Sequence, residues 1–138
     1  MDRAAVHRWL DGWALGWATH DVDLIASLYV DGPVQRSEPF REPDEPGRYA
    51  AWAFAEEEQA EVWFAEPYVT GADSAACEWW AISTAADGSV LTLAGVSLLR
   101  FAADGRVEDQ RDYWSQRTGE HEPWPGWGPV AAHYGKSD

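Results

Sequence analysis

Cysteine, basic side chains and long apolar runs are all scarce in this sequence of 138 residues. The single cysteine, Cys77, cannot form a disulfide within the chain and cannot by itself seed a zinc site. Ten Lys and Arg residues stand against 24 Asp and Glu residues, which gives a formal net charge of −14. Nucleic acids and anionic membranes are bound through Lys and Arg contacts to phosphates, so we expect neither as a partner. The same charge disfavours phosphorylated and coenzyme A-type ligands.

Two further absences bear on location and on cofactors. No run approaches the ~20 apolar residues of a membrane span, and the N-terminus lacks the basic and apolar segments of a signal peptide, so we expect a cytoplasmic protein. The four histidines are scattered without the close pairing of metal ligands, and no glycine-rich loop opens a helix after a strand. We therefore expect neither a metal site nor a phosphate-binding loop.

Tryptophan, by contrast, is abundant. The chain has ten Trp residues, and 46% of its residues are hydrophobic, which predicts a folded domain with a substantial core. A Trp side chain is large and flat and carries one N–H donor, so it serves cores, interfaces and ligand pockets alike. Most of these residues are therefore expected in the core or an interface, and some in a pocket.

The first half of the chain is predicted to be mainly helical. One helix is expected over residues 4–18, where large apolar side chains recur at helical spacing: Val6, Trp9, Leu10, Trp13 and Trp17. A second helix is expected over residues 21–29 and a third over residues 48–58, whose acidic run, EEE, is interpreted as a solvent-facing side. A short strand over residues 34–40 lies between them.

The second half is predicted to form a sheet. Four extended segments, residues 61–73, 75–84, 89–102 and 106–116, are separated by GADS, ADGS and ADGR, which are typical of antiparallel hairpin turns. This order predicts an α+β fold in which a cone-shaped, curved antiparallel sheet wraps around three N-terminal helices and encloses a pocket. The Pro- and Trp-rich tail, residues 117–138, is expected to lack regular structure.

Three segments carry a resemblance to a known family: WALGWATHDVDLIASLYVDG (residues 13–32), GPVQRSEPF (32–40) and LAGVSLLRFAADGRVEDQRDYW (93–114). In order and turn pattern the chain resembles the nuclear transport factor 2-like superfamily, in its SnoaL-like polyketide cyclase and ketosteroid isomerase-related branch. The resemblance implies one domain over residues 1–116, followed by the tail. It also implies a deep pocket between the helices and the concave sheet face, and a homodimer formed through the outer face.

Strand alternation groups the candidate pocket residues, and the resemblance selects the face. Side chains two residues apart share a face, so Gln110, Asp112 and Trp114 belong together. The isomerases carry a pocket acid on their central strand at the position of Ser97. The resemblance to the isomerases therefore implies that Ser97 faces the pocket, together with Gln110, Asp112 and Trp114. On the strand over residues 75–84, it implies that Glu78, Trp80 and Ile82 face the pocket.

The resemblance also implies roles for residues near the N-terminus. The isomerases place their general base before a Pro, where this chain has Glu38, and their oxyanion tyrosine maps near Trp13. Because Trp13 and Ser97 replace both oxyanion donors, steroid isomerisation is disfavoured. SnoaL-like cyclases use a carboxylate on a late strand without metal or cofactor, which points to Asp112. Epoxide hydrolysis is a third option, although Arg100 and Arg111 lie on the wrong faces for it.

These observations lead to two main hypotheses for the function, and both involve a small, apolar, cyclic ligand. In the first, the protein is a cofactor-independent acid/base enzyme of cyclase, isomerase or hydrolase type, with Asp112 as the catalytic group and Glu38 and Glu78 assisting. The substrate-binding residues would be Trp13, Trp17, Tyr29, Trp80, Ser97, Gln110 and Trp114. In the second, the protein is a non-catalytic ligand-binding or accessory domain. A third reading fills the pocket with the chain's own Trp residues.

The residues themselves leave alternatives open. Asp112 could instead pair with Arg36 at a strand edge, and Glu78 could face solvent because a lone buried acid is costly. Trp13 and Trp17 could belong to the core, as aromatic side chains on one helix face usually do.

Overall fold

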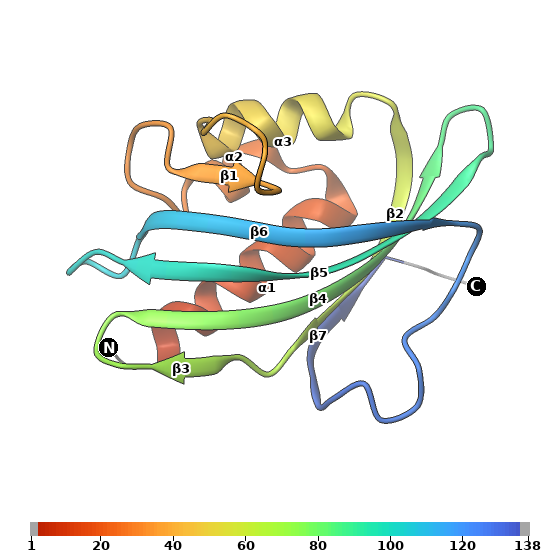
Figure 1. Cartoon of the computed structure of the whole chain (residues 1–138). Helices are drawn as coiled ribbons and strands as arrows, with labels where there is room; N and C mark the ends of the chain where they lie inside the picture. The colour runs from red at the N-terminus through yellow and green to blue at the C-terminus, as the bar shows by residue number, and fades with distance from the viewer. Residues whose placement is uncertain (1–2, 136–138) are drawn as a thin grey trace.

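The computed structural model describes residues 3–135 and combines three helices with a curved sheet (Figure 1). The helices are α1 (Arg3–Thr19), α2 (Val22–Ala26) and α3 (Pro46–Phe54). The strands are β1 (Gln35–Ser37), β2 (Glu57–Ala65), β3 (Tyr68–Thr70), β4 (Ser74–Ala85), β5 (Val90–Phe101), β6 (Val107–Thr118) and β7 (Val130–Tyr134). The predicted α+β class with three N-terminal helices is confirmed. None of the helices in the described residues is long and apolar enough to cross a membrane.

The strands form one seven-stranded sheet in the order β1-β6-β5-β4-β2-β7, with β3 paired to β4. All the pairs are antiparallel except β1 with β6, which is parallel, so the sheet is mixed at one edge. Helix α1 crosses one face of this sheet (Figure 1). The apolar face predicted for α1 is buried against the sheet: Val6, Trp9, Leu10 and Trp13 are each at most 7% exposed.

Two hairpins decide which side chains face the helices. Between β4 and β5, a tight turn with Gly88 at a φ of 88° pairs Thr84 with Val90. Odd-numbered residues of β4 therefore share a face of the sheet with odd-numbered residues of β5. Between β5 and β6, a bulge at Arg100 and Phe101 changes the parity. Ser97 therefore pairs with Cys77 on one side and with Asp112 on the other. These three side chains share the face that packs toward the helices.

The tail differs from its expectation of irregular structure. Residues 130–134 form β7, which pairs antiparallel with β2. No Pro or Gly lies between Pro129 and Gly135, so the VAAHY segment between them can complete the sheet edge. The division at residue 116 stays a prediction, since β6 runs beyond it to Thr118.

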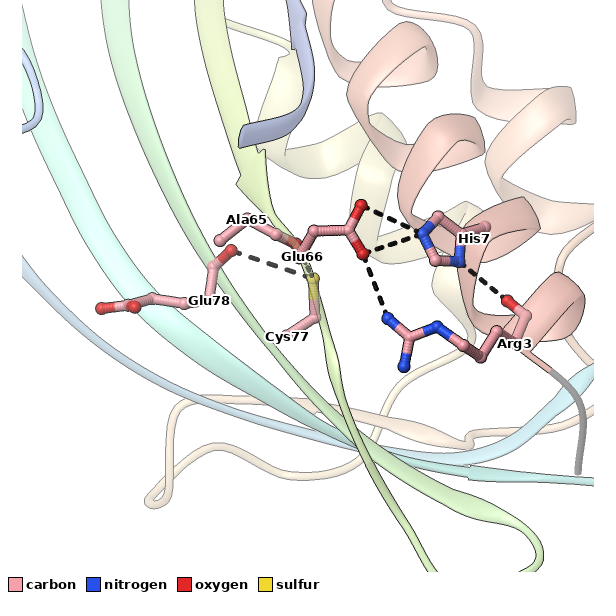
Figure 2. Close-up of polar contacts among 6 residues, drawn as sticks. All are labelled: Arg3, His7, Ala65, Glu66, Cys77 and Glu78. Carbon is pink, nitrogen blue, oxygen red and sulfur yellow. Dashed lines mark hydrogen bonds and ion pairs between the residues drawn. The ribbon is translucent and has the colours of Figure 1, made fainter. Parts of the chain in front are cut away.

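The single cysteine is a buried, inert group. Cys77 is fully buried, and its Sγ donates to the main-chain oxygen of Ala65 at 3.4 Å (Figure 2). Burial raises the pKa of its thiol to about 12. We expect the native protein to react with a water-soluble disulfide reagent at least about 10³-fold more slowly than free cysteine, because modification requires opening of the fold. Rapid labelling in native buffer, followed by absorbance, would contradict this placement of Cys77.

Candidate functional site

A cavity of about 230 Å³ lies between the concave face of the sheet and helices α1 and α3. Its walls are mostly aromatic: Trp9, Trp13, Trp17, Tyr49, Phe54, Phe64, Trp79 and Trp114. The polar side chains on the same walls are Gln35, Ser37, Glu57, Ser83, Ser97, Gln110 and Asp112. The chain's own Trp residues therefore line the space without filling it, which contradicts the third reading of the sequence.

Asp112 lies in the middle of β6 and is 5% exposed. Its Oδ1 accepts hydrogen bonds from Ser97 Oγ at 2.7 Å and Gln110 Nε2 at 2.9 Å. Its Oδ2 accepts from Gln35 Nε2 at 3.2 Å. Arg36 instead donates to the main-chain oxygen of Arg41, so the ion pair considered for Asp112 is not formed among the described residues. Asp112 is a buried carboxylate held by neutral donors.

Burial raises the pKa of Asp112 above its ordinary value, while the hydrogen bonds from Ser97, Gln110 and Gln35 oppose the rise. Neutral amides and a hydroxyl stabilise a carboxylate less than a cation does, and desolvation remains the largest effect. The result is a carboxyl group that holds a proton more readily than an exposed aspartate, at the wall of an apolar cavity. A rise is the direction in which the pKa of a carboxyl group must shift for general acid/base chemistry near neutral pH.

A hydrogen-bond network behind the wall fixes the donors to Asp112. Tyr29 accepts from Trp13 Nε1 at 2.6 Å and from Trp9 Nε1 at 3.1 Å, and its hydroxyl donates to Gln110 Oε1. With its oxygen held there, Gln110 directs its NH₂ group to Asp112. Burial raises the pKa of Tyr29, so it stays protonated and remains a donor.

Ser97 is held in the same way on the other side of Asp112. Trp79 Nε1 donates to Ser97 Oγ at 3.1 Å, which leaves the hydroxyl hydrogen for Asp112. Ser97→Ala should cost about 1–3 kcal/mol in the free energy of unfolding, because it strands the buried Trp79 N–H and removes a donor to Asp112. Urea denaturation measures this, with the exposed Ser115→Ala as control. A cost no larger than the control's would contradict the network.

The structure brings six of the ten sequence-predicted site residues to the cavity wall: Trp13, Trp17, Ser97, Gln110, Asp112 and Trp114. Tyr29 lies behind the wall, 3% exposed, and contributes through the network. Trp13 likewise directs its N–H to Tyr29 and presents only its ring to the cavity. Glu38, Glu78 and Trp80 are outside the cavity lining.

The placement of Glu78, Trp80 and Ile82 in the pocket is wrong, because β4 has the opposite parity. The β4–β5 hairpin pairs odd residues with odd residues, so Trp79 joins Ser97 on the inner face. Figure 2 shows the Glu78 side chain extending away from helix α1. On the outer face, Trp80 donates to the main-chain oxygen of His121 at 2.7 Å. Its ring packs edge-on against Trp124 and Trp127 of the tail, and Ile82 belongs to the same outer cluster.

Glu38 is also outside the cavity, for a different reason. β1 ends at Ser37, which pairs with Asp112, and Glu38 then turns the chain with a φ of 82°. Its carboxylate accepts from the main-chain N–H of Phe40 at 2.9 Å, an arrangement typical of a turn. The inward-facing residues of β1 are Gln35 and Ser37, so the general-base position implied by the resemblance carries no carboxylate in the cavity.

Glu57 is a second carboxylate at the cavity wall, and nothing in the sequence pattern indicates it. The third helix ends at Phe54 rather than near residue 58, and Glu57 begins β2 with a side chain only 8% exposed. Its Oε1 accepts from His20 Nε2 at 2.8 Å and from Trp17 Nε1 at 3.1 Å, and its Oε2 accepts from Ser83. The EEE run resembles a solvated helix side, so the residue pattern held no signal for this burial.

No protein-family profile and no curated protein sequence matches the chain. A nuclear transport factor 2-like protein of unknown function from Exiguobacterium sp. is similar in structure, with a TM-score of 0.65 and 18% identity over 80% of this chain and 98% of the other. Δ5-3-ketosteroid isomerase from Mycobacterium sp. gives a TM-score of 0.65 and 18% identity, over 84% and 96%.

A third similar structure is a Mycobacterium tuberculosis protein in complex with estradiol-17β-hemisuccinate, with a TM-score of 0.68 and 17% identity over 85% of this chain and 99% of the other. All three cover most of both chains, at identities that carry information on the fold alone. The order of three helices and a curved sheet, the concave cavity and these likenesses agree. The chain has the nuclear transport factor 2-like fold.

Proposed function

We propose that the protein binds an apolar, cyclic small molecule in the cavity and catalyses a proton transfer on it, with Asp112 as the acid/base group. The observation that carries this proposal is the position of Asp112: a buried carboxylate at an aromatic cavity wall, held by three neutral donors. Burial raises its pKa, which makes it a better base than an exposed aspartate. The reaction would be of cyclase, isomerase or hydrolase type and would need no cofactor.

The chemistry follows from the geometry around the two carboxylate oxygens. Oδ1 is engaged by two donors, whereas Oδ2 has one, so Oδ2 is the atom with room for a proton. In this mechanism Oδ2 accepts a proton from an acidic C–H or O–H of the ligand and then returns it at another position. The aromatic walls exclude water, which would otherwise exchange with that proton. Trp114 and Trp79 would hold the ligand's rings.

The alternative is a non-catalytic ligand-binding or accessory domain that uses the same cavity. It is favoured by the absence of Glu38 and Glu78 from the cavity lining, since neither is placed to assist Asp112. The isomerase and the estradiol-hemisuccinate complex among the similar structures are consistent with either role. Turnover separates the two roles, because both require binding.

We propose further that the protein is cytoplasmic and forms a homodimer through the outer face of the sheet. Tyr113, on that face of β6, is 43% exposed, as an interface residue would be in a single chain. Trp80 is instead covered by the chain's own tail, so the interface would centre on β5 and β6 rather than β4. A monomeric mass by light scattering at micromolar concentration would contradict the dimer.

The experiment that tests the proposed function begins with native mass spectrometry of the purified protein, to identify any small molecule that copurifies. That molecule and its close analogues are then incubated with the protein, and products are followed by chromatography. We expect an apolar, cyclic ligand and its conversion without added metal or cofactor. A bound ligand that is returned unchanged would support the binding alternative instead.

A further inference from the structure

The cavity has a second polar end, built around Glu57. Its carboxylate lines the cavity and is held by three donors from three different elements: Trp17 of α1, His20 of the α1–α2 turn and Ser83 of β4. His20 is held in turn by stacking on Phe54, with ring centroids 4.7 Å apart. A surface glutamate would not collect donors from three elements. Glu57 is therefore a fixed group of the cavity wall, as Asp112 is.

The two carboxylates lie at different points along the sheet, Asp112 in the middle of β6 and Glu57 at the start of β2. Asp112 lies beside Ser97, which pairs with Cys77, whereas Glu57 is bonded to Ser83, six residues farther along β4. At a rise of ~3.3 Å per residue, Cys77 and Ser83 are about 20 Å apart along β4. Both side chains reach inward from these positions, and Trp79 and Trp17 lie on the wall between them. The space suits an elongated, flat molecule.

Each end keeps unused hydrogen-bond acceptors. A carboxylate has about four acceptor positions, and Asp112 receives three hydrogen bonds. Glu57 also has three donor side chains, and the N–H of one of them, Trp17, is shared between Oε1 at 3.1 Å and Oε2 at 3.3 Å. Beside Asp112, Gln35 is 2% exposed, and its Oε1 has no hydrogen-bond partner among the described residues. A buried amide oxygen without a hydrogen-bond donor destabilises the fold, so a ligand hydroxyl that donates to Gln35 Oε1 would supply the missing hydrogen bond.

The charges of the lining residues further restrict the kind of ligand that the cavity can bind. No Lys or Arg is among the residues that line the cavity in the described part of the chain, residues 3–135. Arg41 lies outside the lining, with its guanidinium over the ring of Trp52 at 4.4 Å and over Tyr49 at 5.6 Å. A carboxylate or phosphate on the ligand would therefore face Asp112 or Glu57 with no lining cation to offset the repulsion.

We infer that the ligand is an elongated apolar molecule with a hydroxyl or amine at each end, and that Glu57 binds the end remote from Asp112. This deepens the proposed function and rests on its ligand-binding step. The hydroxyl near Asp112 donates to Gln35 Oε1, and the group at the other end donates to Glu57. An anionic group at either end is excluded.

Two related steroids test the inference: estradiol, which has a hydroxyl at each end, and its 17-hemisuccinate, in which one hydroxyl is esterified with succinate and that end carries a carboxylate. Equilibrium dialysis gives the Kd of each for the parent protein and for Glu57→Gln. We expect the parent to bind estradiol at least 10-fold more tightly than the hemisuccinate. Glu57→Gln should weaken estradiol at least 10-fold and reduce the preference, because it removes both a charged acceptor and a repulsion. The adjacent, exposed Glu58→Gln makes the same charge change and should leave both Kd values unchanged.

The remaining outcomes overturn the inference. Tighter binding of the hemisuccinate, lost on Arg41→Ala, would place an anionic end beside Arg41 and Tyr49. An unchanged preference in Glu57→Gln would remove Glu57 from the binding site. Failure of the parent to bind either steroid or the shorter diol 2,6-dihydroxynaphthalene would exclude a ligand with two hydroxyl ends. These binding measurements do not report on the conversion of a copurified ligand by Asp112. The proposed function is therefore tested by a separate experiment and can fail or succeed independently.

Discussion

Asp112→Asn is expected to lower turnover by about 10²–10⁴-fold while raising the melting temperature at neutral pH. Loss of turnover follows because an amide cannot take up and return a proton. The gain in stability follows because a buried charge without a cation partner is costly to form, and the variant has no charge. A gain on the order of 1 kcal/mol corresponds to a few degrees in a domain of this size.

The neighbours of Asp112 can accept an asparagine. Ser97 and Gln110 donate to Oδ1, which asparagine retains. At the Oδ2 position asparagine presents an NH₂ group to Gln35, whose amide can turn so that its unpartnered Oε1 becomes the acceptor. The substitution therefore keeps all three hydrogen bonds at this position, and the one unpartnered group of Gln35 becomes its NH₂ in place of its oxygen. The main change in the variant is the loss of the charge.

The stability gain depends on pH. Because burial raises the pKa of Asp112 above 3.8, between 3.8 and that higher value the folded chain holds a proton that the unfolded chain has released. The free energy of unfolding of the parent therefore falls as the pH rises through this window, and the variant lacks that fall. The advantage of Asp112→Asn should be complete above the window and absent below about pH 3.8.

Thermal denaturation of the parent and of Asp112→Asn across this pH range measures the difference between their melting temperatures. The other carboxylates are the same in both proteins, so their contributions cancel in this difference. The control is Asp109→Asn, on the outer face of β6, whose partner Arg111 lies 3.4 Å away. It should give no gain at neutral pH. A melting temperature for Asp112→Asn that is lowered at neutral pH, or raised equally at every pH, would show that Asp112 is not a desolvated carboxylate.

Gly95→Ala is expected to destabilise the fold by about 3 kcal/mol or more. Gly95 lies on β5 opposite Trp114, where the two strands approach closely on the inner face of the curved sheet. A Cβ at this position would meet Trp114 Cβ at 2.5 Å and Cα at 2.8 Å, as well as the main-chain oxygen of Tyr113. Main-chain atoms cannot move aside as a flexible side chain can, so the strands would have to separate and Trp114 would leave the cavity wall.

Urea denaturation with circular dichroism measures this cost, and Gly71→Ala is the matched control. Gly71 has a φ of 72°, and no atom lies within 4 Å of the place that an alanine Cβ would take, so alanine there should cost only the ~1–2 kcal/mol of a left-handed backbone. The two substitutions make the same chemical change. Equal costs would mean that the close approach of β5 and β6, and with it the position of Trp114, is wrong.

The fold was largely predictable because its signals are local. The spacing of Val6, Trp9, Leu10 and Trp13 specifies the buried face of α1, and the Asp-Gly turns specify the hairpins. The tail was misjudged because its Pro and Gly content was averaged over the whole segment, although VAAHY contains neither. Regular structure depends on the residues within the strand itself.

The site residues were predictable only on the strands whose pairing register could be inferred from the sequence. Ser97 and Asp112 were placed on a shared inner face, and the bulge at Arg100 and Phe101 is what brings them together. Glu78 and Trp80 were misplaced because the number of residues in the β4–β5 turn sets the parity of β4, and one residue inverts every side chain. Glu57 was missed because its burial depends on where β2 begins, which is decided by contacts with Trp17, His20 and Ser83.

The most direct test of the central claim is the pKa of Asp112 itself. It can be measured by ¹³C NMR of carboxyl-labelled aspartate, with the Asp112 resonance assigned by its absence from Asp112→Asn. We expect a carboxyl group that titrates above the ordinary value of 3.8, as a buried group held by neutral donors should. A pKa at or below 3.8 would contradict it, because Asp112 would then be a well-stabilised carboxylate with no readiness to hold a proton.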